Sequence, residues 1–117
     1  MKANQSTTKL AHNRAKDFVD QCAKRFDAVK EQAGKDYIVK VFCSTSTGEW
    51  QATSMAPLSE DFITFQSFDG VIQTFTVAAV EQVALHLRVT KREPNEKQPE
   101  MEFKKMGFHT FTSIKSR

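Results

Sequence analysis

The sequence predicts a mainly β protein in which an N-terminal α-helix is followed by a five-stranded, strongly bent antiparallel barrel. Between residues 10 and 33 the apolar residues recur at steps of three and four, which is the pattern of one helix face. The chain then changes to short runs of β-branched and aromatic residues on tight connections. Two of these runs, 62–68 and 71–77, are joined through Asp69-Gly70, a strong hairpin signal. Five short antiparallel strands tend to curl into a small barrel because closure removes exposed edges.

The helix is expected from Leu10 to Ala33. Gly34 stands where a glycine commonly ends a helix, and a hydroxyl residue at 6–8 can cap its start. The face opposite the apolar stripe carries Lys, Arg, Asp and Glu, and is expected to face water. The stripe consists of Leu10, Ala11, Ala15, Phe18, Val19, Cys22, Phe26, Val29 and Ala33.

The five strands are expected at residues 37–43, 50–56, 62–68, 71–77 and 83–90. The first strand is almost wholly apolar, as in a strand that is covered on both faces. A polar turn at 44–48 separates the first two strands, and Pro57 ends the second. Residues 78–82 are expected to form one tight turn before the last strand. In that strand Val83, Leu85, Leu87 and Val89 share a face.

Length and charge limit the classes of function. A chain of 117 residues forms one domain with, at most, a tail. Its net charge of +3 is unevenly spread, since residues 1–33 and 88–117 are basic and residues 34–87 are acidic. Attraction to nucleic acid would therefore have to come mainly from the two ends, because phosphate neutralisation needs Lys and Arg.

The residue types that carry catalysis or bind metals are scattered. His12, His86 and His109 fall on three different segments without the spacing of metal ligands. Cys22 and Cys43 are expected to be small buried residues rather than nucleophiles. Four glycines leave no phosphate-binding loop. The sequence therefore predicts no enzyme activity, no cofactor, no metal and no small-molecule substrate.

The same sequence shows no segment that would direct it to a membrane. The N-terminal residues lack the apolar core of a signal peptide, and no apolar run is long enough to span a bilayer. Two cysteines are too few for a disulfide framework. A cytoplasmic location without membrane contact is expected.

The order of elements resembles a known family. A helix followed by five strands, with a long bent second strand and a tight turn before the fifth, is similar to the Sm-like (LSm) family and its bacterial Hfq branch, whose fold is an SH3-like barrel. The resemblance covers about residues 6–90. In GEWQATSMAPLSEDFITF, Gly48, Glu60 and Phe62 stand at the glycine, acidic and aromatic places of the first motif.

The second motif is matched in shape by TFTVAAVEQVAL, with Val80 and Val83 at its apolar places. The chain departs from the family pattern at four points. Glu60 replaces an Asp, Thr64 replaces an Asn, and the second glycine of the first motif is missing. The Lys-His or Arg-Gly pair before the fifth strand is replaced by the segment 77–79.

The resemblance implies an assembly. In Sm-like proteins the fourth strand of one subunit pairs with the fifth strand of the next, and the contact closes into a hexamer or heptamer ring. A homo-oligomer of this kind is expected here. The interface residues would then be Val71, Gln73, Phe75, Val77, Val83, Leu85 and Leu87.

The resemblance also implies RNA as a partner. Phe62, between Glu60 and Thr64, would stack on a base, which needs no base-specific hydrogen bond. Without the Lys-His pair, phosphate contacts would move to the basic ends, in particular to Lys91 and Arg92. A core position for Phe62 and a merely solvated basic surface are the alternatives. Two functions follow: an Sm-like RNA-binding module acting as a homo-oligomeric ring, or a ring-forming structural or protein-interaction barrel that has lost RNA binding.

The last part of the chain is expected to differ from the domain at 1–90. Residues 91–117 form a linker and a C-terminal tail. The linker KREPNEKQPE contains two prolines and no apolar residue, whereas Phe103, Phe108, Phe111 and Ile114 are too apolar for a purely solvating tail. Residues 101–114 are therefore expected to dock, either on the exposed face of their own barrel or on a neighbouring subunit.

Overall fold

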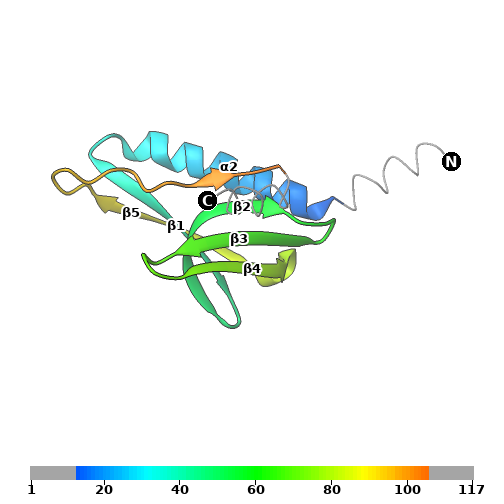
Figure 1. The fold of residues 1–117 in the computed structure, drawn as a ribbon. Helices are drawn as coiled ribbons and strands as arrows, with labels where there is room; N and C mark the ends of the chain where they lie inside the picture. The colour runs from blue at the N-terminus through cyan, green and yellow to red at the C-terminus, as the bar shows by residue number, and fades with distance from the viewer. Residues whose placement is uncertain (1–12, 106–117) are drawn as a thin grey trace.

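The structure is a computed structural model that describes residues 13–105 (Figure 1). One helix is followed by strands, in the predicted order. The elements are α2 (Arg14–Ala33), β1 (Tyr37–Thr45), β2 (Gly48–Pro57), β3 (Phe62–Phe68), β4 (Gln73–Ala79), the 3-10 turn η1 (Val80–Gln82), β5 (Ala84–Lys91) and β6 (Glu102–Phe103). The predicted helix and five antiparallel strands are confirmed, with ends that shift by a few residues. The predicted helix start at Leu10 lies outside the described residues.

The strands form one sheet in the order β4-β3-β2-β1-β5, and β6 pairs with β2 in parallel. Strands β4 and β5 are the two edges of this path, so the sheet is not closed and the predicted SH3-like barrel is not confirmed. Strand β2 is the bent element. Its first part pairs with β1 and its second part pairs with β3, with an irregular register between Ala52 and Ser54. An extra residue in one strand bends it and increases its twist.

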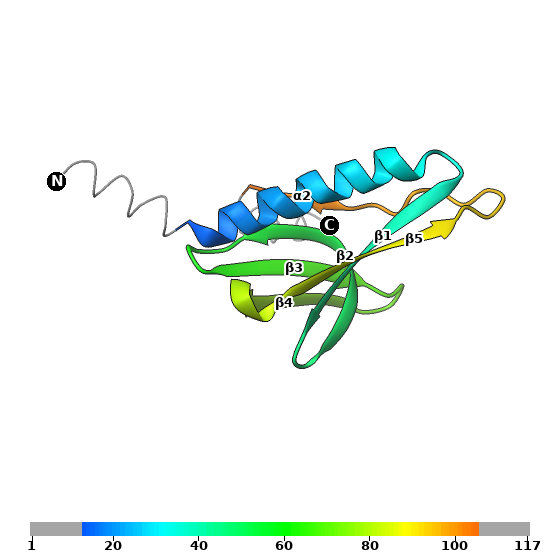
Figure 2. The same ribbon diagram turned by 180° about the vertical axis from the view of Figure 1, so that it is seen from behind.

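Helix α2 packs on one face of the sheet, which we name the inner face (Figure 2). Helix residues at steps of three and four meet strand residues at alternate positions, so both periodicities serve one core. The buried core consists of Ala15, Val19, Cys22 and Phe26 of α2, Val39, Val41 and Cys43 of β1, Ala52 and Met55 of β2, and Ile63 and Phe65 of β3. The ring of Phe65 lies 5.8 Å from that of Trp50, centre to centre. Burial of each large apolar side chain contributes roughly 1.5–3 kcal/mol.

The segment after β5 runs back along the sheet. Strand β1 pairs with β5 from Tyr37 to Ser44 but with β2 only from Phe42 to Thr45, so β2 leaves one edge of its first half unpaired. The Gln98 carboxamide supplies a partner there, because its Oε1 accepts the Val39 N–H at 3.0 Å and its Nε2 donates to the Val39 carbonyl at 2.6 Å. Further along, Phe103 packs on Phe26 with ring centres 5.7 Å apart. The predicted linker is therefore fixed to the sheet by polar contacts.

The predicted docking of residues 101–114 can be followed only as far as Lys105. Met101 and Phe103 pack against the core, and the Lys104 N–H donates to the Met55 carbonyl at 2.8 Å. Residues 106–114 lie outside the described residues. Within residues 13–105, no helix has the length and apolar character needed to cross a membrane.

Candidate functional site

The turn of the β3–β4 hairpin is held by one carboxylate. Oδ1 of Asp69 accepts the N–H groups of Ile72 at 2.7 Å and of Val71 at 2.9 Å. These two backbone hydrogen bonds, that from Ile72 first, lower the pKa of Asp69. Gly70 has a φ of 99°, a region that favours glycine. The predicted hairpin is thus confirmed, but its turn extends to Ile72, and β4 begins at Gln73 rather than at Val71.

The face of the sheet opposite α2, which we name the outer face, carries the alternate residues of this hairpin. In β3 these are Phe62, Thr64, Gln66 and Phe68, and in β4 they are Gln73, Phe75, Val77 and Ala79, as the paired register requires. Five of the eight exposed large hydrophobic side chains of the described residues lie on the hairpin, with exposed fractions of 45–87%. They are Phe62, Phe68, Val71, Ile72 and Val77, which we name the hairpin patch.

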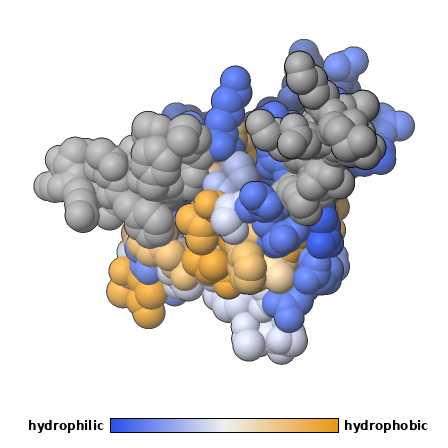
Figure 3. Space-filling model, turned by 90° about the vertical axis from the view of Figure 1, so that its right-hand side faces the viewer, coloured by the Kyte–Doolittle hydropathy of each residue, from blue (hydrophilic) through white to orange (hydrophobic). Residues whose placement is uncertain are grey.

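Such a concentration of apolar surface on one element is typical of an interaction site. Apolar surface is visible on the molecule from the side at which α2 begins, where orange residues gather in the lower part of the view beside blue hydrophilic ones (Figure 3). The hairpin patch borders β4, which pairs only with β3 within residues 13–105. An edge strand presents backbone donors and acceptors to a further strand. The patch and the edge therefore form one continuous candidate contact.

The predicted interface residues are divided between the two edges of the sheet. Gln73, Phe75 and Val77 lie in β4, and Val71 lies in the turn before it. Leu85 and Leu87 lie in β5 and, like Val83 before that strand, are half-buried against the core. These three side chains therefore stabilise the fold of their own chain. The part of β5 that a partner could contact is its backbone edge. The structure does not bring the two edges together within one chain.

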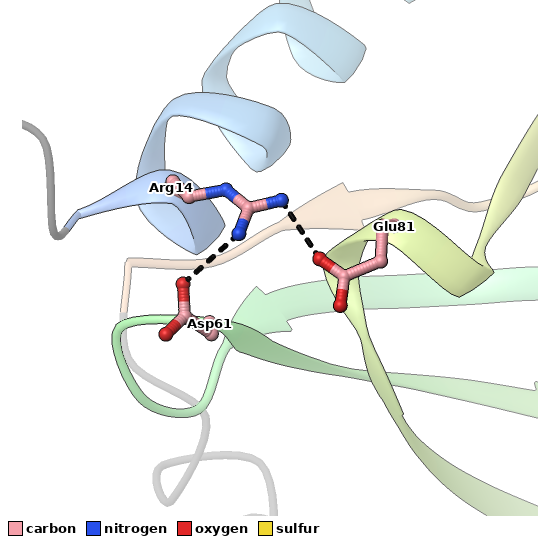
Figure 4. A network of polar contacts seen from close by, with 3 residues as sticks. All are labelled: Arg14, Asp61 and Glu81. Atoms are coloured by element: carbon pink, nitrogen blue, oxygen red, sulfur yellow. Dashed lines mark hydrogen bonds and ion pairs between the residues drawn. The ribbon is translucent and has the colours of Figure 1, made fainter.

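The surroundings of Phe62 are acidic. Two backbone hydrogen bonds of 2.9 Å join the preceding residues to α2 and η1: Ala15 N–H to the Glu60 carbonyl, and Val80 N–H to the Asp61 carbonyl. The guanidinium of Arg14 contacts Glu81 at 2.8 Å and Asp61 at 3.5 Å (Figure 4).

Two carboxylates, those of Asp61 and Glu81, thus share Arg14 next to the predicted stacking residue, and the exposed Glu60 adds a third negative charge nearby in the sequence. The ring of Phe62 is 45% exposed and so is not a core side chain. It is available for stacking, but the charge around it repels phosphate.

Thr64, the second predicted contact beside Phe62, is only 2% exposed. Its Oγ1 has no hydrogen-bond partner among the described residues. In this chain its hydroxyl is therefore not offered to solvent. Glu60 is exposed in the turn before β3, and its backbone carbonyl caps the helix.

Lys91 and Arg92 lie at the other end of the molecule. Arg92 donates from Nε to the Lys35 carbonyl at 2.8 Å and from Nη1 to the Glu96 carbonyl at 2.7 Å. Lys35 follows the end of α2 and Glu60 meets its start, and a helix of 20 residues is about 30 Å long. The structure therefore does not bring Phe62 and the two basic residues together in one chain.

A cavity of about 460 Å³ lies beside Lys91 and Arg92. It is lined by Asp36, Tyr37, Lys91, Arg92, Glu93, Pro94 and Asn95. Tyr37 is 44% exposed and is the aromatic side chain that the sequence analysis missed here. The sequence signal that could have identified it is that Tyr37 is the single tyrosine of the chain and stands at the start of a predicted strand. The acidic Asp36 and Glu93 offset the positive charge of this cavity.

The cysteines belong to the core. Burial raises the pKa of Cys22 to about 12, and burial together with the nearby Cys22 raises that of Cys43 to about 12. A thiol with such a pKa is protonated at neutral pH and is a poor nucleophile. Within residues 13–105, no group of three or more His, Cys, Asp or Glu side chains is placed to hold a metal ion.

Comparison with protein-family models, with curated proteins and with solved structures gave no match. The class of protein is therefore inferred from the geometry: a small, mainly β fold with a helix on one face of an antiparallel sheet and two edge strands.

Proposed function

We propose that this chain is a self-assembling module of the Sm-like type, in which β4 of one subunit pairs with β5 of the next. One observation carries the proposal: the two edges of the antiparallel sheet are β4 and β5, and the hairpin patch borders the first of them. A contact between two different edges repeats from subunit to subunit and either closes into a ring or grows into a fibre. A closed hexamer or heptamer, as the resemblance implies, is the soluble outcome.

Physical chemistry supports a partner at β4. An exposed strand edge beside apolar side chains associates with other chains unless something covers it. Pairing with β5 would satisfy the backbone groups of both edges at once. The bend in β2 and the strand order around it agree with an SH3-like barrel of the Sm-like kind, which forms part of this proposal.

We infer that the ring serves a structural or protein-interaction role. The acidic residues Glu60, Asp61 and Glu81 around Phe62 disfavour a phosphate chain at the place where the resemblance puts RNA. The basic residues Lys91 and Arg92 lie near the opposite end of α2 and are accompanied by Asp36 and Glu93.

The mass of the chain in solution tests the assembly. Light scattering at micromolar concentration should give a hexamer or heptamer of the 13.3 kDa chain. The Val77→Lys variant places a charge at the β4 edge, where the side chain is exposed, and should give monomers that keep the fold. Leu58→Lys, an exposed apolar position in the β2–β3 turn, is the matched control and should assemble normally. A monomeric wild-type chain would contradict the proposal.

RNA binding is the second candidate, and the exposed ring of Phe62 is the observation that favours it. Filter binding of a uridine-rich and an adenine-rich RNA across a salt series distinguishes the two functions. An RNA-binding ring should bind less tightly as salt rises. Phe62→Ala should then weaken binding by about 1–3 kcal/mol, the value of one stacked base. Phe68→Ala, at the other end of the same strand face, should not. Absence of binding at low salt would exclude the RNA-binding function and favour the structural or protein-interaction ring.

A further inference from the structure

The turn between β3 and β4 carries the most exposed large hydrophobic side chains of residues 13–105. Val71 is 87% exposed and Ile72 is 61% exposed. The turn itself uses only their backbone N–H groups, which donate to the carboxylate of Asp69. Turn positions usually hold Gly, Asn, Asp, Ser or Pro. Two consecutive β-branched apolar residues at such a place therefore indicate a contact surface rather than a requirement of the turn.

A second exposed apolar group lies at the end of β5. Tyr37 is 44% exposed and Val89 is 45% exposed, and the register pairs Tyr37 with Lys91. Tyr37 lines the cavity of about 460 Å³ whose other walls are residues 36 and 91–95. Cavities of about 300–1,000 Å³ hold drug-sized ligands, so this cavity has room for two aliphatic side chains.

The walls of this cavity are fixed by hydrogen bonds. The Arg92 N–H donates to the Asp36 carbonyl at 2.8 Å, and the Arg92 guanidinium donates to the carbonyls of Lys35 and Glu96. The loop beyond Arg92 is closed by the Glu96 N–H, which donates to the Glu93 carbonyl at 3.0 Å, and by the Glu93 N–H, which donates to Oε1 of Glu96 at 2.9 Å. A site that is formed before its partner arrives loses less conformational entropy on binding.

The directions of the two edge strands bring the turn and the cavity together in an assembly. Strands β4 and β5 follow one another through η1 and run in opposite directions. The β3–β4 turn and the end of β5 therefore both lie towards the end of the molecule at which α2 finishes (Figures 1 and 2). β4 has seven residues and β5 has eight, so antiparallel pairing over their full length places Gln73 beside the last residues of β5. The two turn residues before Gln73 then reach the cavity of the neighbouring chain, which begins at Lys91.

The charges of the two surfaces are compatible with this contact. Asp36 and Glu93 balance Lys91 and Arg92 in the lining of the cavity, so the lining favours an apolar occupant over a phosphate group. The hairpin 62–79 contains no Lys or Arg, and its single charged residue is Asp69. In the antiparallel pairing this exposed carboxylate would lie close to Lys91, which is also exposed.

We propose that the β3–β4 turn of one subunit fills this cavity of the next subunit, with Val71 and Ile72 packed against Tyr37. This proposal rests on the proposed function, since pairing of β4 with β5 brings the two surfaces together. Backbone pairing by itself specifies the register of two strands weakly, because the same hydrogen-bond pattern recurs after a shift of two residues. The turn in its cavity supplies the side-chain contact that fixes this register.

The assembly of exposed-surface variants tests the contact. Val71→Ser with Ile72→Ser keeps the backbone bonds of the turn. It should raise the concentration at half-assembly about tenfold or more in light scattering, since two aliphatic side chains lose their burial. Tyr37→Ala should have a similar effect, and the three substitutions together should add little more, because they remove the same contact. Leu58→Ser, at the exposed apolar position of the β2–β3 turn, is the control and should change nothing. With native circular dichroism in every variant, an unchanged midpoint or fully additive effects would overturn the contact.

Disulfide formation between chains separates this inference from the proposed function. Val71→Cys chains are mixed with Glu93→Cys or Pro94→Cys chains that carry a different tag, and the two native cysteines are buried. Oxidation should link chains that carry the two tags, because the two β-carbons come within the roughly 4 Å that a disulfide requires. Thr47→Cys, at an exposed position of the β1–β2 turn, should not link to Val71→Cys. Wild-type assembly without either linkage would overturn this inference and leave the proposed function. A wild-type chain that is monomeric at every concentration would overturn both.

Discussion

Strand β3 carries apolar side chains on both faces, and the two faces have different surroundings. On the inner face Ile63 and Phe65 lie under α2 and are fully buried. On the outer face Phe62 and Phe68 are about half exposed. The chemistry of the two pairs is alike, but Ile63 and Phe65 lie within the strand under α2, whereas Phe62 and Phe68 are its first and last residues. The inner face stabilises the fold, whereas the two ends of the outer face retain exposed apolar surface that can bind something else.

The largest expected effect concerns the inner face. Phe65→Ala should lower the free energy of unfolding by about 3–5 kcal/mol, because it leaves a cavity under the helix. Phe68→Ala removes the same atoms from the outer face of the same strand and should cost about 0.5 kcal/mol or less. Urea unfolding of both variants measures the difference. Similar losses would show that the outer face is as much a part of the core as the inner one.

Cys22 and Cys43 test the burial of the inner face, because both lie in the core between α2 and the sheet. With a pKa raised from 9.0 to about 12, each thiol should react with maleimide at pH 8 about a thousandfold more slowly than an unfolded thiol. A raised pKa favours the protonated thiol in the folded state. The resulting stability is therefore fully present below pH 9 and is lost as the pH rises towards 12. Labelling of the native chain at the unfolded rate would contradict this burial.

A smaller effect is expected at the strand start that β2 leaves unpaired. Gln98→Ala removes two hydrogen bonds to Val39 and should cost about 1–3 kcal/mol, since the half-buried backbone groups lose their partner. Gln51→Ala, an exposed glutamine in β2, is the control and should be nearly neutral. Hydrogen exchange at the Val39 amide measures the local change. Equal protection in wild type and variant would refute the role of Gln98.

The smallest effect is expected at the hairpin turn. Asp69→Ala should destabilise the hairpin slightly, because the N–H groups of Val71 and Ile72 then bond only to water. The pKa of Asp69 is lowered from 3.8, so the ionised form is favoured in the fold. The stabilisation that ionised Asp69 gives the hairpin is therefore present above pH 3.8, its unfolded pKa, and is lost as the pH falls through the lower pKa of the folded state. A wild-type chain and an Asp69→Ala variant with the same acid unfolding profile would show that the turn gains nothing from this carboxylate.

The main elements could be predicted because their signals are local. The helix stripe, the strand alternation and Asp69-Gly70 each depend on residues close together in the sequence. The role of Gln98 could not be predicted, since its partner Val39 is far away in the chain and no periodicity connects them. Strand β6 was missed for the same reason: its two residues form a strand only because β2 lies beside them.

The candidate site was less predictable than the fold. Alternation places Phe62 and Thr64 on the same face of β3, yet one is 45% and the other 2% exposed. Their exposure depends on what crosses that face, which a pattern within the strand does not record. Likewise Lys91 and Arg92 are close in the sequence to the predicted edge strand, but the length of α2 separates them from Phe62.

Hydrogen exchange at two protein concentrations tests most directly that β4 and β5 are the subunit contacts. At high concentration the edge amides of residues 76–79 and 84–90 should exchange more slowly than in a dilute, monomeric sample. The amides of Ser46 and Thr47, in the β1–β2 turn, should be unaffected. Exchange that is identical at both concentrations, or protection that appears away from the two edges, would contradict the proposed assembly.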